Sequence, residues 1–142
     1  GPPAPRPTAL PAPAPGALPR VPLLTTWLGD DGSALAAVHE AGVDGVVLAG
    51  FGAGHVSARM AEVVGRVAVD VPVVIASRTG AGPTARAVYD YPGSEIDQAD
   101  RGALRAGWLA PLKARLLLAA LLAEGPVAPD VLAVRIEAYG GA

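Results

Sequence analysis

Residues 43–54, with the sequence VDGVVLAGFGAG, decide the fold class of this chain. The first half of the stretch is an apolar run rich in valine, and the second half places glycine at every other position. After it, apolar residues recur at the i, i+3, i+4, i+7 spacing of an amphipathic helix, at Met60, Val63, Val64 and Val67. A strand that is apolar on both faces and precedes such a helix is typical of a parallel sheet covered on both sides.

The segments that flank this unit continue the alternation of strand and helix. Residues 21–26 form a short apolar and β-branched run, and residues 71–76 form another apolar run. Between the first run and residue 43, Asp and Ser at 30–33 offer helix caps and Gly42 offers a C-terminal stop. The sequence therefore predicts strand, helix, strand, helix and strand in this order.

The second half of the chain is less regular. Residues 77–102 mix Gly and Pro with polar residues, so we expect a long irregular loop there. A short fourth strand is expected at 103–106, and Pro fits the first helical position at the start of 111–123 and of 129–139. The whole pattern predicts an α/β fold, a three-layer Rossmann-like domain with a small parallel sheet flanked by helices.

The amino-terminal residues differ in composition from the rest of the chain. Nine of the 15 Pro lie in residues 1–22, where Pro alternates mostly with Ala. Because Pro fixes φ and favours extended backbone before it, we expect residues 1–20 to be a disordered, Pro/Ala-rich linker. Residues 21–142 are expected to form a single α/β domain.

Charge and composition argue against several classes of function. The net charge is −2, with 11 Lys and Arg scattered among 13 acids, so we expect no nucleic-acid partner. The chain has no Cys and two His without acidic neighbours at ligand spacing, so we expect no metal and no cofactor. The longest apolar run, 116–123, is far shorter than the ~20 residues that cross a bilayer. We expect a soluble, cytoplasmic protein without membrane contact.

In parallel α/β sheets, ligands bind beyond the carboxyl ends of the strands. We therefore expect the functional face to include the loop with Gly50, Gly52 and Gly54 and the long loop 77–102. The glycines could expose backbone N–H groups to an anion, or they could form a tight turn between strand and helix. A dinucleotide fingerprint would need Gly at position 55, which is His, so we favour the tight turn.

Other candidate groups also have two interpretations. His55 at the start of a helix would be kept neutral by the helix dipole, and it could bind a ligand or be an exposed cap. Ser77 has no base spaced for a triad, so we expect a capping or loop-bonding role rather than nucleophilic catalysis. The long loop also gathers acids and phenols that could form a solvated surface or bind an ammonium group: Tyr89, Asp90, Tyr91, Glu95, Asp97 and Asp100.

Four stretches together resemble the carboxyl-terminal domain of bacterial L-asparaginases. They are DGVVLAGFGAGH at 44–55, PVVIASR at 72–78, Glu95 ahead of Gly102, and LAPLKAR at 109–115. The similarity runs from about Val21 to Tyr139 in the same order and with similar spacing. It implies a smaller α/β domain that follows a linker.

The resemblance also implies what the chain lacks. The family hydrolyses L-asparagine to L-aspartate and ammonia with threonines in a larger amino-terminal domain, within Thr-Gly-Gly-Thr and Thr-Asp-Thr motifs. Neither motif occurs here, so we expect no catalytic residue on this chain and no activity from it alone. The implied partners are the missing amino-terminal domain, L-asparagine and further copies of the chain, since family active sites close between neighbouring subunits.

Two site residues follow from the resemblance. The family's carboxyl-terminal domain reaches a neighbour's active site with an acid and an amide that hold the substrate's α-amino end. The acid corresponds to Glu95 and the amide position to His55, where the family more often has Asn. An imidazole supplies one donor or one acceptor where an amide supplies both. Because Glu95 stands in a loop rich in Gly and Pro, we expect it to contribute little to the core.

Two other functions remain open at this point. The chain could be a non-catalytic α/β module that binds a small molecule or nucleotide on the same scaffold. It could also be part of an asparaginase-like amidotransferase that handles amide nitrogen on tRNA, and the net charge of −2 counts against that alternative.

Overall fold

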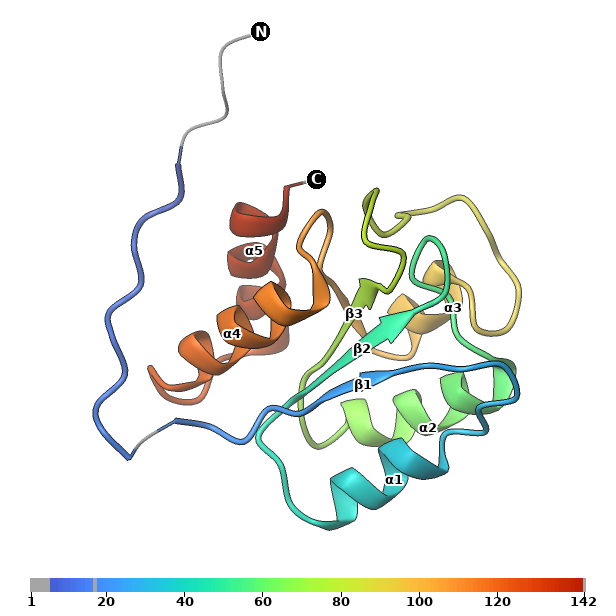
Figure 1. The fold of residues 1–142 in the computed structure, drawn as a ribbon, viewed down its shortest axis with the longest axis horizontal. Helices are drawn as coiled ribbons and strands as arrows, with labels where there is room; N and C mark the ends of the chain where they lie inside the picture. The colour runs from blue at the N-terminus through green and yellow to red at the C-terminus, as the bar shows by residue number, and fades with distance from the viewer. Residues whose placement is uncertain (1–5, 17, 142) are drawn as a thin grey trace, which may run out of the picture.

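The computed structural model describes residues 6–16 and 18–141 and centres on a four-stranded parallel sheet (Figure 1). The strands follow the order of the chain: β1 (Leu23–Thr25), β2 (Val46–Gly50), β3 (Val73–Ser77) and β4 (Leu104–Arg105). In register, Leu48 pairs with Leu24 on one side and with Ile75 on the other. The expected small parallel sheet is confirmed.

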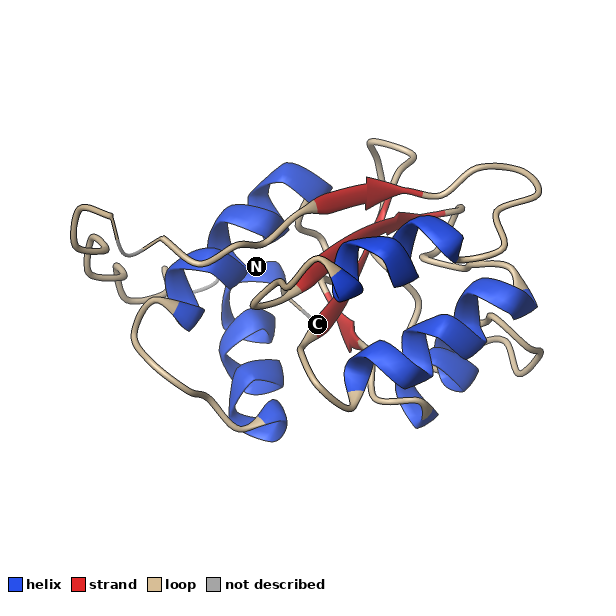
Figure 2. Cartoon of the chain, turned by 90° about the horizontal axis from the view of Figure 1, so that it is seen from below, coloured by secondary structure: helices blue, strands red, loops and turns tan. Residues whose placement is uncertain are grey.

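Helices cover both faces of this sheet, which gives the expected three layers (Figure 2). Helices α1 (Ser33–Glu40), α2 (Ala58–Ala68) and α3 (Glu95–Asp100) lie on one face. Helices α4 (Pro111–Leu122) and α5 (Pro129–Gly140) lie on the other. The α/β class and the Rossmann-like architecture are therefore as the sequence predicts.

Each face of the sheet has its own apolar core. Val46 and Leu48 pack with residues of α1 and α2, whereas Val47, between them, packs with residues of α4 and α5. Successive side chains of a strand point to opposite faces, so a strand covered on both sides is apolar at every position. This geometry explains why the runs at 46–50 and 73–77 are continuous rather than alternating.

The helix ends follow the local chemistry of the sequence. The Ser57 hydroxyl caps α2 by accepting the N–H of Met60 at 3.1 Å, and Pro opens both α4 and α5. Helix α1 starts after Gly32, which has a φ of 83°. A Cβ at Gly32 would lie 2.5 Å from the side chain of Val63, so this glycine also lets α1 approach α2.

The expectation that residues 77–102 form one irregular loop is wrong at its end, where α3 forms. The Ser94 hydroxyl accepts the N–H of Asp97 at 3.4 Å, and the Asp97 carboxylate accepts the N–H of Gly93 at 2.8 Å. These are the interactions of a helix cap. A six-residue helix is shorter than two turns, so it shows no apolar period by which the sequence could reveal it.

The segment before the sheet forms neither helix nor strand in residues 6–16 and 18–22. The backbone N–H of Arg20 donates to the Asp44 carboxylate at 2.7 Å, and Val21 is buried against the core. Residues 1–5 and 17 of the expected linker lie outside the described residues, and its boundary at residue 20 stays a prediction. Within the described part of the chain, no helix has the length and apolarity to cross a bilayer.

Candidate functional site

The loops after β2 and β3 leave the same edge of the sheet, at the carboxyl ends of the strands (Figure 1). Gly50 and Ser77 are register partners at that edge, so the glycine loop, residues 50–54, starts beside the loop 78–94. Helix α3 follows the second loop and packs near α2. Side chains far apart in the sequence therefore meet around the glycine loop.

The glycine loop is a tight turn, as favoured from the sequence. The carbonyl of Phe51 accepts the N–H groups of both Gly54 and His55 at 2.8 Å. A Cβ at Gly50 would lie 2.8 Å from the carbonyl oxygen of His55, and one at Gly54 would lie 2.9 Å from the side chain of Thr84. Close packing of the loop against itself and its neighbours therefore accounts for these two glycines.

Two side chains at the end of β3, Ser77 and Arg78, hold the glycine loop in place. The Ser77 hydroxyl donates to the carbonyl of Gly52 at 2.5 Å, which confirms its expected role in bonding the loop. The Arg78 guanidinium lies 4.4 Å from the ring centroid of Phe51 and donates to the carbonyl of Thr26 at 3.0 Å. The position of the glycine loop is thus fixed from two sides.

The expectation that His55 begins a helix is wrong. Helix α2 starts at Ala58 after its cap Ser57, so His55 lies in the turn before the helix and outside the reach of its first turn. The His55 ring instead contacts two side chains of the long loop and α3. Its Nε2 lies 2.7 Å from Oε2 of Glu95, and its Nδ1 lies 2.5 Å from the hydroxyl of Tyr91.

Glu95, the first residue of α3, is buried, with 4% of its surface exposed. Its Oε1 accepts the N–H groups of Val88 at 2.6 Å and Tyr89 at 2.7 Å, and its Oε2 faces His55. Burial raises the pKa of the Glu95 carboxyl, but these backbone N–H groups and the His55 ring outweigh it and hold the pKa below its usual value. Glu95 is therefore a buried, ionised carboxylate at neutral pH.

The structure divides the run of acids and phenols in the long loop. Asp90 and Asp100 are exposed, as a solvated surface requires, and Asp97 pairs with Arg101 at 3.0 Å. The surface interpretation is wrong for Glu95, which is buried, whereas its expected small contribution to the core stays a prediction. The cause of this burial is tertiary, because Glu95 folds back onto the N–H groups of its own loop.

Two tyrosines surround His55 on its outer side. The rings of Tyr89 and Tyr91 meet the imidazole edge to face, with centroids 5.2 Å and 5.3 Å away. Their own centroids are 6.0 Å apart, and both residues are about half exposed, at 47% and 46%. The inner part of the site is therefore the buried, anionic carboxylate of Glu95, and its outer part is formed by the two aromatic rings.

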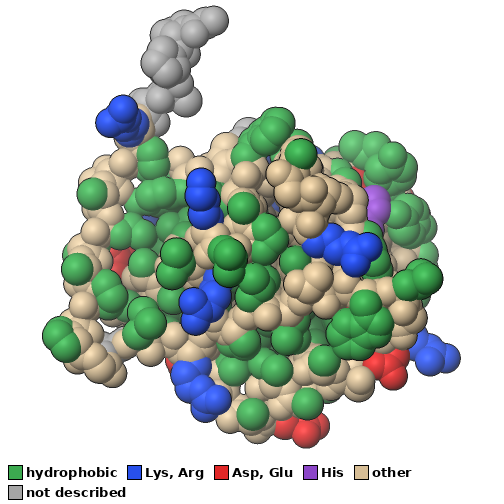
Figure 3. Space-filling model, in the orientation of Figure 1, with side chains coloured by type: hydrophobic (Ala, Val, Ile, Leu, Met, Phe, Trp, Pro, Cys, Tyr) green, Lys and Arg blue, Asp and Glu red, His purple; other side chains and the backbone are tan. Residues whose placement is uncertain are grey.

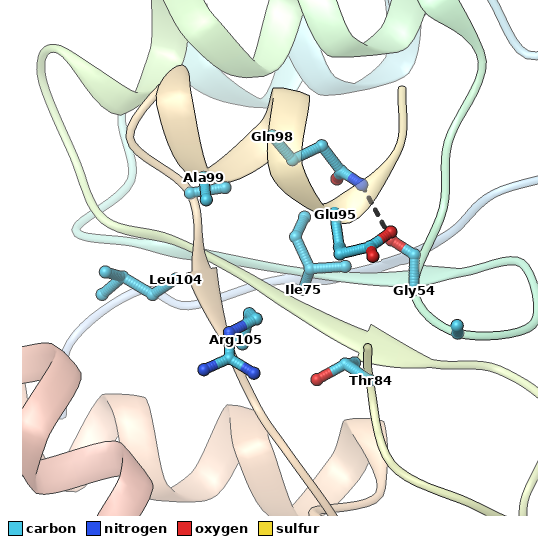
Figure 4. Close-up of a pocket in the computed structure, with 10 residues that line it drawn as sticks. Gly54, Ile75, Thr84, Glu95, Gln98, Ala99, Leu104 and Arg105 are labelled. Atoms are coloured by element: carbon cyan, nitrogen blue, oxygen red, sulfur yellow. Dashed lines mark hydrogen bonds between the residues drawn. The ribbon is translucent and has the colours of Figure 1, made fainter. Parts of the chain in front are cut away.

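Sequence reasoning missed two further residues of this site. Gln98 is buried, and its Nε2 donates to the carbonyls of Gly54 at 2.8 Å and Gly93 at 3.0 Å (Figure 4). Arg105 lies on β4, where burial and the nearby Arg86 lower the pKa of its guanidinium and Glu95 opposes that shift. The i, i+3 spacing of Glu95 and Gln98 places them on one helix face, a signal that is visible only once α3 is recognised.

The cavity beside these residues is too small for a substrate. Glu95, Gln98 and Arg105 line a space of about 10 Å³, shown in Figure 4, which has room for a single water at most. In the described part of the chain, no group of three or more His, Cys, Asp or Glu side chains could hold a metal ion. The groups of this arrangement that are open to a ligand are the half-exposed Tyr89 and Tyr91, which surround His55.

Fold and site together define an α/β domain that gathers polar and aromatic side chains at the carboxyl ends of a parallel sheet. Among α/β domains, the sequence matches a specific family: residues 20–133 match the model of the Glutaminase/Asparaginase C-terminal domain. The chain belongs to this family. The resemblance noted from the motifs of the glycine loop and of α4 is confirmed.

Two relatives carry asparaginase names. The chain is 38% identical over 112 residues to a probable L-asparaginase of Deinococcus radiodurans, an alignment that covers 79% of this chain and 34% of the relative. It is 36% identical over 108 residues to an L-asparaginase of Bacillus licheniformis, covering 75% of this chain and 33% of the relative. The chain thus spans about a third of the length of these relatives.

Proposed function

We propose that this chain is the carboxyl-terminal domain of an amidohydrolase that converts L-asparagine and water to L-aspartate and ammonia. Family membership over residues 20–133 and the names of both relatives support this proposal. Since the chain spans about a third of each relative, the threonine nucleophile would come from an amino-terminal domain. The domain would act in a homo-oligomer, in which it contributes to a neighbouring subunit's active site.

In this proposal, Glu95 supplies the charge that attracts the α-amino end of L-asparagine, and His55 orients the Glu95 carboxylate through its ring Nε2. The observation that carries it is the buried, ionised carboxylate of Glu95, with His55 at 2.7 Å, at the ligand-binding edge of the sheet. A carboxylate has about four lone-pair sites, and Glu95 uses three of them on Val88, Tyr89 and His55. One lone-pair site and the negative charge are left over from these three contacts. An ammonium group would be attracted to them from the outer side of the site, because the cavity beside Glu95 holds a single water at most.

The hydroxyls of Thr26, Thr79 and Thr84 make hydrogen bonds to backbone groups, which argues against a nucleophilic role for these three residues. The hydroxyl of buried Thr26 donates to the carbonyl of Ala49 at 3.0 Å, and the hydroxyl of buried Thr84 accepts the N–H of Gly107 at 3.1 Å. The Thr79 hydroxyl donates to the carbonyl of Ala81 at 2.7 Å. None of these contacts is to a general base, so none activates the hydroxyl for attack.

A chimera tests the proposal. The matching carboxyl-terminal part of the Deinococcus radiodurans relative is replaced by residues 20–142 of this chain, and ammonia release from L-asparagine is measured. We expect turnover from the chimera and none from the 142-residue chain alone. A chimera that melts cooperatively but releases no ammonia would contradict the proposal, as would turnover by the chain alone that survives Thr25→Ala and Thr79→Ala together.

Matched variants in the chimera test the role of Glu95. Glu95→Gln keeps the shape and can still accept the two backbone N–H groups, but it removes the charge. We expect KM to rise roughly ten- to a hundredfold, since a hydrogen bond to a charged group contributes about 1.5 to 3 kcal/mol. Glu62→Gln, an exposed change on α2, is the control and should leave KM unchanged. An unchanged KM in Glu95→Gln would rule out this site.

A further inference from the structure

We infer that the hydroxyl of Tyr91 is a further substrate-binding group, which accepts a hydrogen bond from a primary ammonium group of the ligand. This inference rests on the proposed function, because it names a new contact for the same α-amino end of the substrate. The inference follows from the two hydrogen bonds that the His55 ring makes in this chain.

Both ring nitrogens of His55 are already engaged. Nε2 bonds Glu95 at 2.7 Å and Nδ1 bonds the Tyr91 hydroxyl at 2.5 Å, and only 15% of the His55 side chain is exposed. An imidazole has no other hydrogen-bonding atom, so His55 has no free group with which to bind a ligand. The exposed polar end of this cluster is the Tyr91 hydroxyl, on a residue that is 46% exposed.

The remaining capacity of the Tyr91 hydroxyl indicates which ligand group fits. The ionised Glu95 carboxylate only accepts, so Nε2 of His55 carries the proton that faces it. Whether the Tyr91 hydroxyl gives its proton to Nδ1 or takes one from it, the Tyr91 oxygen keeps at least one lone pair toward solvent. That lone pair can accept a hydrogen bond from a donor on the ligand.

The buried charge favours a cationic donor over a neutral one. Hydrogen bonds in a chain polarise one another, so Glu95 makes the Tyr91 oxygen more negative through the His55 ring. The Tyr89 ring, with its centroid 6.0 Å from that of Tyr91, adds an aromatic group that can attract a cation at the same place. The ligand class that fits is a primary ammonium, such as the α-amino group of an amino acid.

The experiment measures ligand binding to the purified 142-residue chain by NMR. The probes are L-asparagine, succinamic acid, which lacks only the α-amino group, and methylammonium. We expect Tyr91→Phe to weaken L-asparagine binding at least about tenfold and to leave succinamic acid unaffected. The control is Tyr139→Phe, which removes a phenol hydroxyl on α5 that contacts the Thr8 carbonyl. Equal effects of Tyr91→Phe on both ligands would overturn the inference.

A second background tests whether the Tyr91 contact depends on the hydrogen-bond chain through His55. Asn at position 55 is too short to link Glu95 to Tyr91, so Tyr91→Phe in a His55→Asn chain should change L-asparagine affinity less than twofold. A loss of tenfold or more that persists in this background would overturn the argument that Glu95 acts on Tyr91 through His55.

The outcomes distinguish this inference from the proposed function. If the chimera turns over L-asparagine and Tyr91→Phe leaves L-asparagine binding to the chain unchanged, the proposed function stands and the Tyr91 contact fails. If methylammonium binds the chain in a Tyr91-dependent way and the folded chimera releases no ammonia, the Tyr91 contact stands and the proposed function fails. If neither amine shifts the resonances of His55 and Tyr91, the Tyr91 contact is overturned, and the chimera alone decides the proposed function.

Discussion

Helices α3 and α4 cover opposite faces of one sheet, but different interactions hold them in place. Helix α4 buries apolar side chains, among them Leu118 and Leu121, both fully buried. Helix α3 buries two polar residues, Glu95 and Gln98, and bonds them to backbone groups of two loops. Apolar burial is non-directional, whereas a hydrogen bond needs a partner in one place. Helix α4 thus contributes mainly stability, and helix α3 fixes the geometry of the site.

The largest expected effect is on the α4 side. Leu118→Ala removes a fully buried side chain from the core between α4 and the sheet, so the free energy of unfolding should fall by about 2–5 kcal/mol. Urea unfolding measures this loss. The NMR signals of the His55 ring should keep their wild-type positions under native conditions. Displaced His55 signals would show that the core at α4 and the site at α3 are coupled, which would contradict the separation of roles between the two helices.

A smaller loss is expected from Gln98→Met on the α3 side. This change removes the donor that holds the carbonyls of Gly54 and Gly93, although Gly93 keeps its bond from the N–H of Val56. It also removes the buried Gln98 Oε1, which has no hydrogen-bond partner in the structure, and this partly offsets the loss. We expect about 1–2 kcal/mol less stability and shifted ring signals of His55. Unshifted signals would mean that Gln98 does not position the site.

The pH dependence of stability sharpens the same contrast. The folded pKa of Glu95 is below its unfolded value, so the unfolded state binds more protons between the two values and stability rises with pH there. This stabilisation is fully present above the ordinary carboxyl pKa and is lost as pH falls through the folded pKa. Glu95→Gln should therefore lose less stability than the wild type when the solution is acidified below about pH 4.5, measured by urea unfolding. Parallel pH profiles would contradict the assignment of an ionised Glu95.

The smallest effect concerns the outer side of α4. Leu112 and Leu116 lie one turn apart on this helix and are exposed by 68% and 61%, and Trp108, in the turn before the helix, is exposed by 62%. Figure 3 shows many hydrophobic side chains on the face of the molecule seen in Figure 1. We expect the purified chain to self-associate weakly, and Leu116→Lys to reduce this association without changing stability by more than about 0.5 kcal/mol. A strictly monomeric species in sedimentation at high concentration would contradict the predicted self-association.

Local sequence signals were sufficient for most of the fold. The continuous apolar runs at 46–50 and 73–77, the helical period at 60–67 and the prolines that open α4 and α5 each act within a few residues. Such short-range patterns determine which segments are strands and helices. Family motifs added Glu95 and His55 as candidate residues, and their role in binding a substrate stays a prediction.

Only the tertiary structure decided how the candidate site is built. His55 and Glu95 are 40 residues apart in the sequence and 2.7 Å apart in space, because two neighbouring strands end at one edge of the sheet. The same folding buries Glu95 and Gln98 and engages both nitrogens of His55. No local pattern encodes these contacts, since each depends on the partner that the packed chain brings to it. The sequence by itself determined the elements and the residue types at the site, and packing determined which atoms remain open to a ligand.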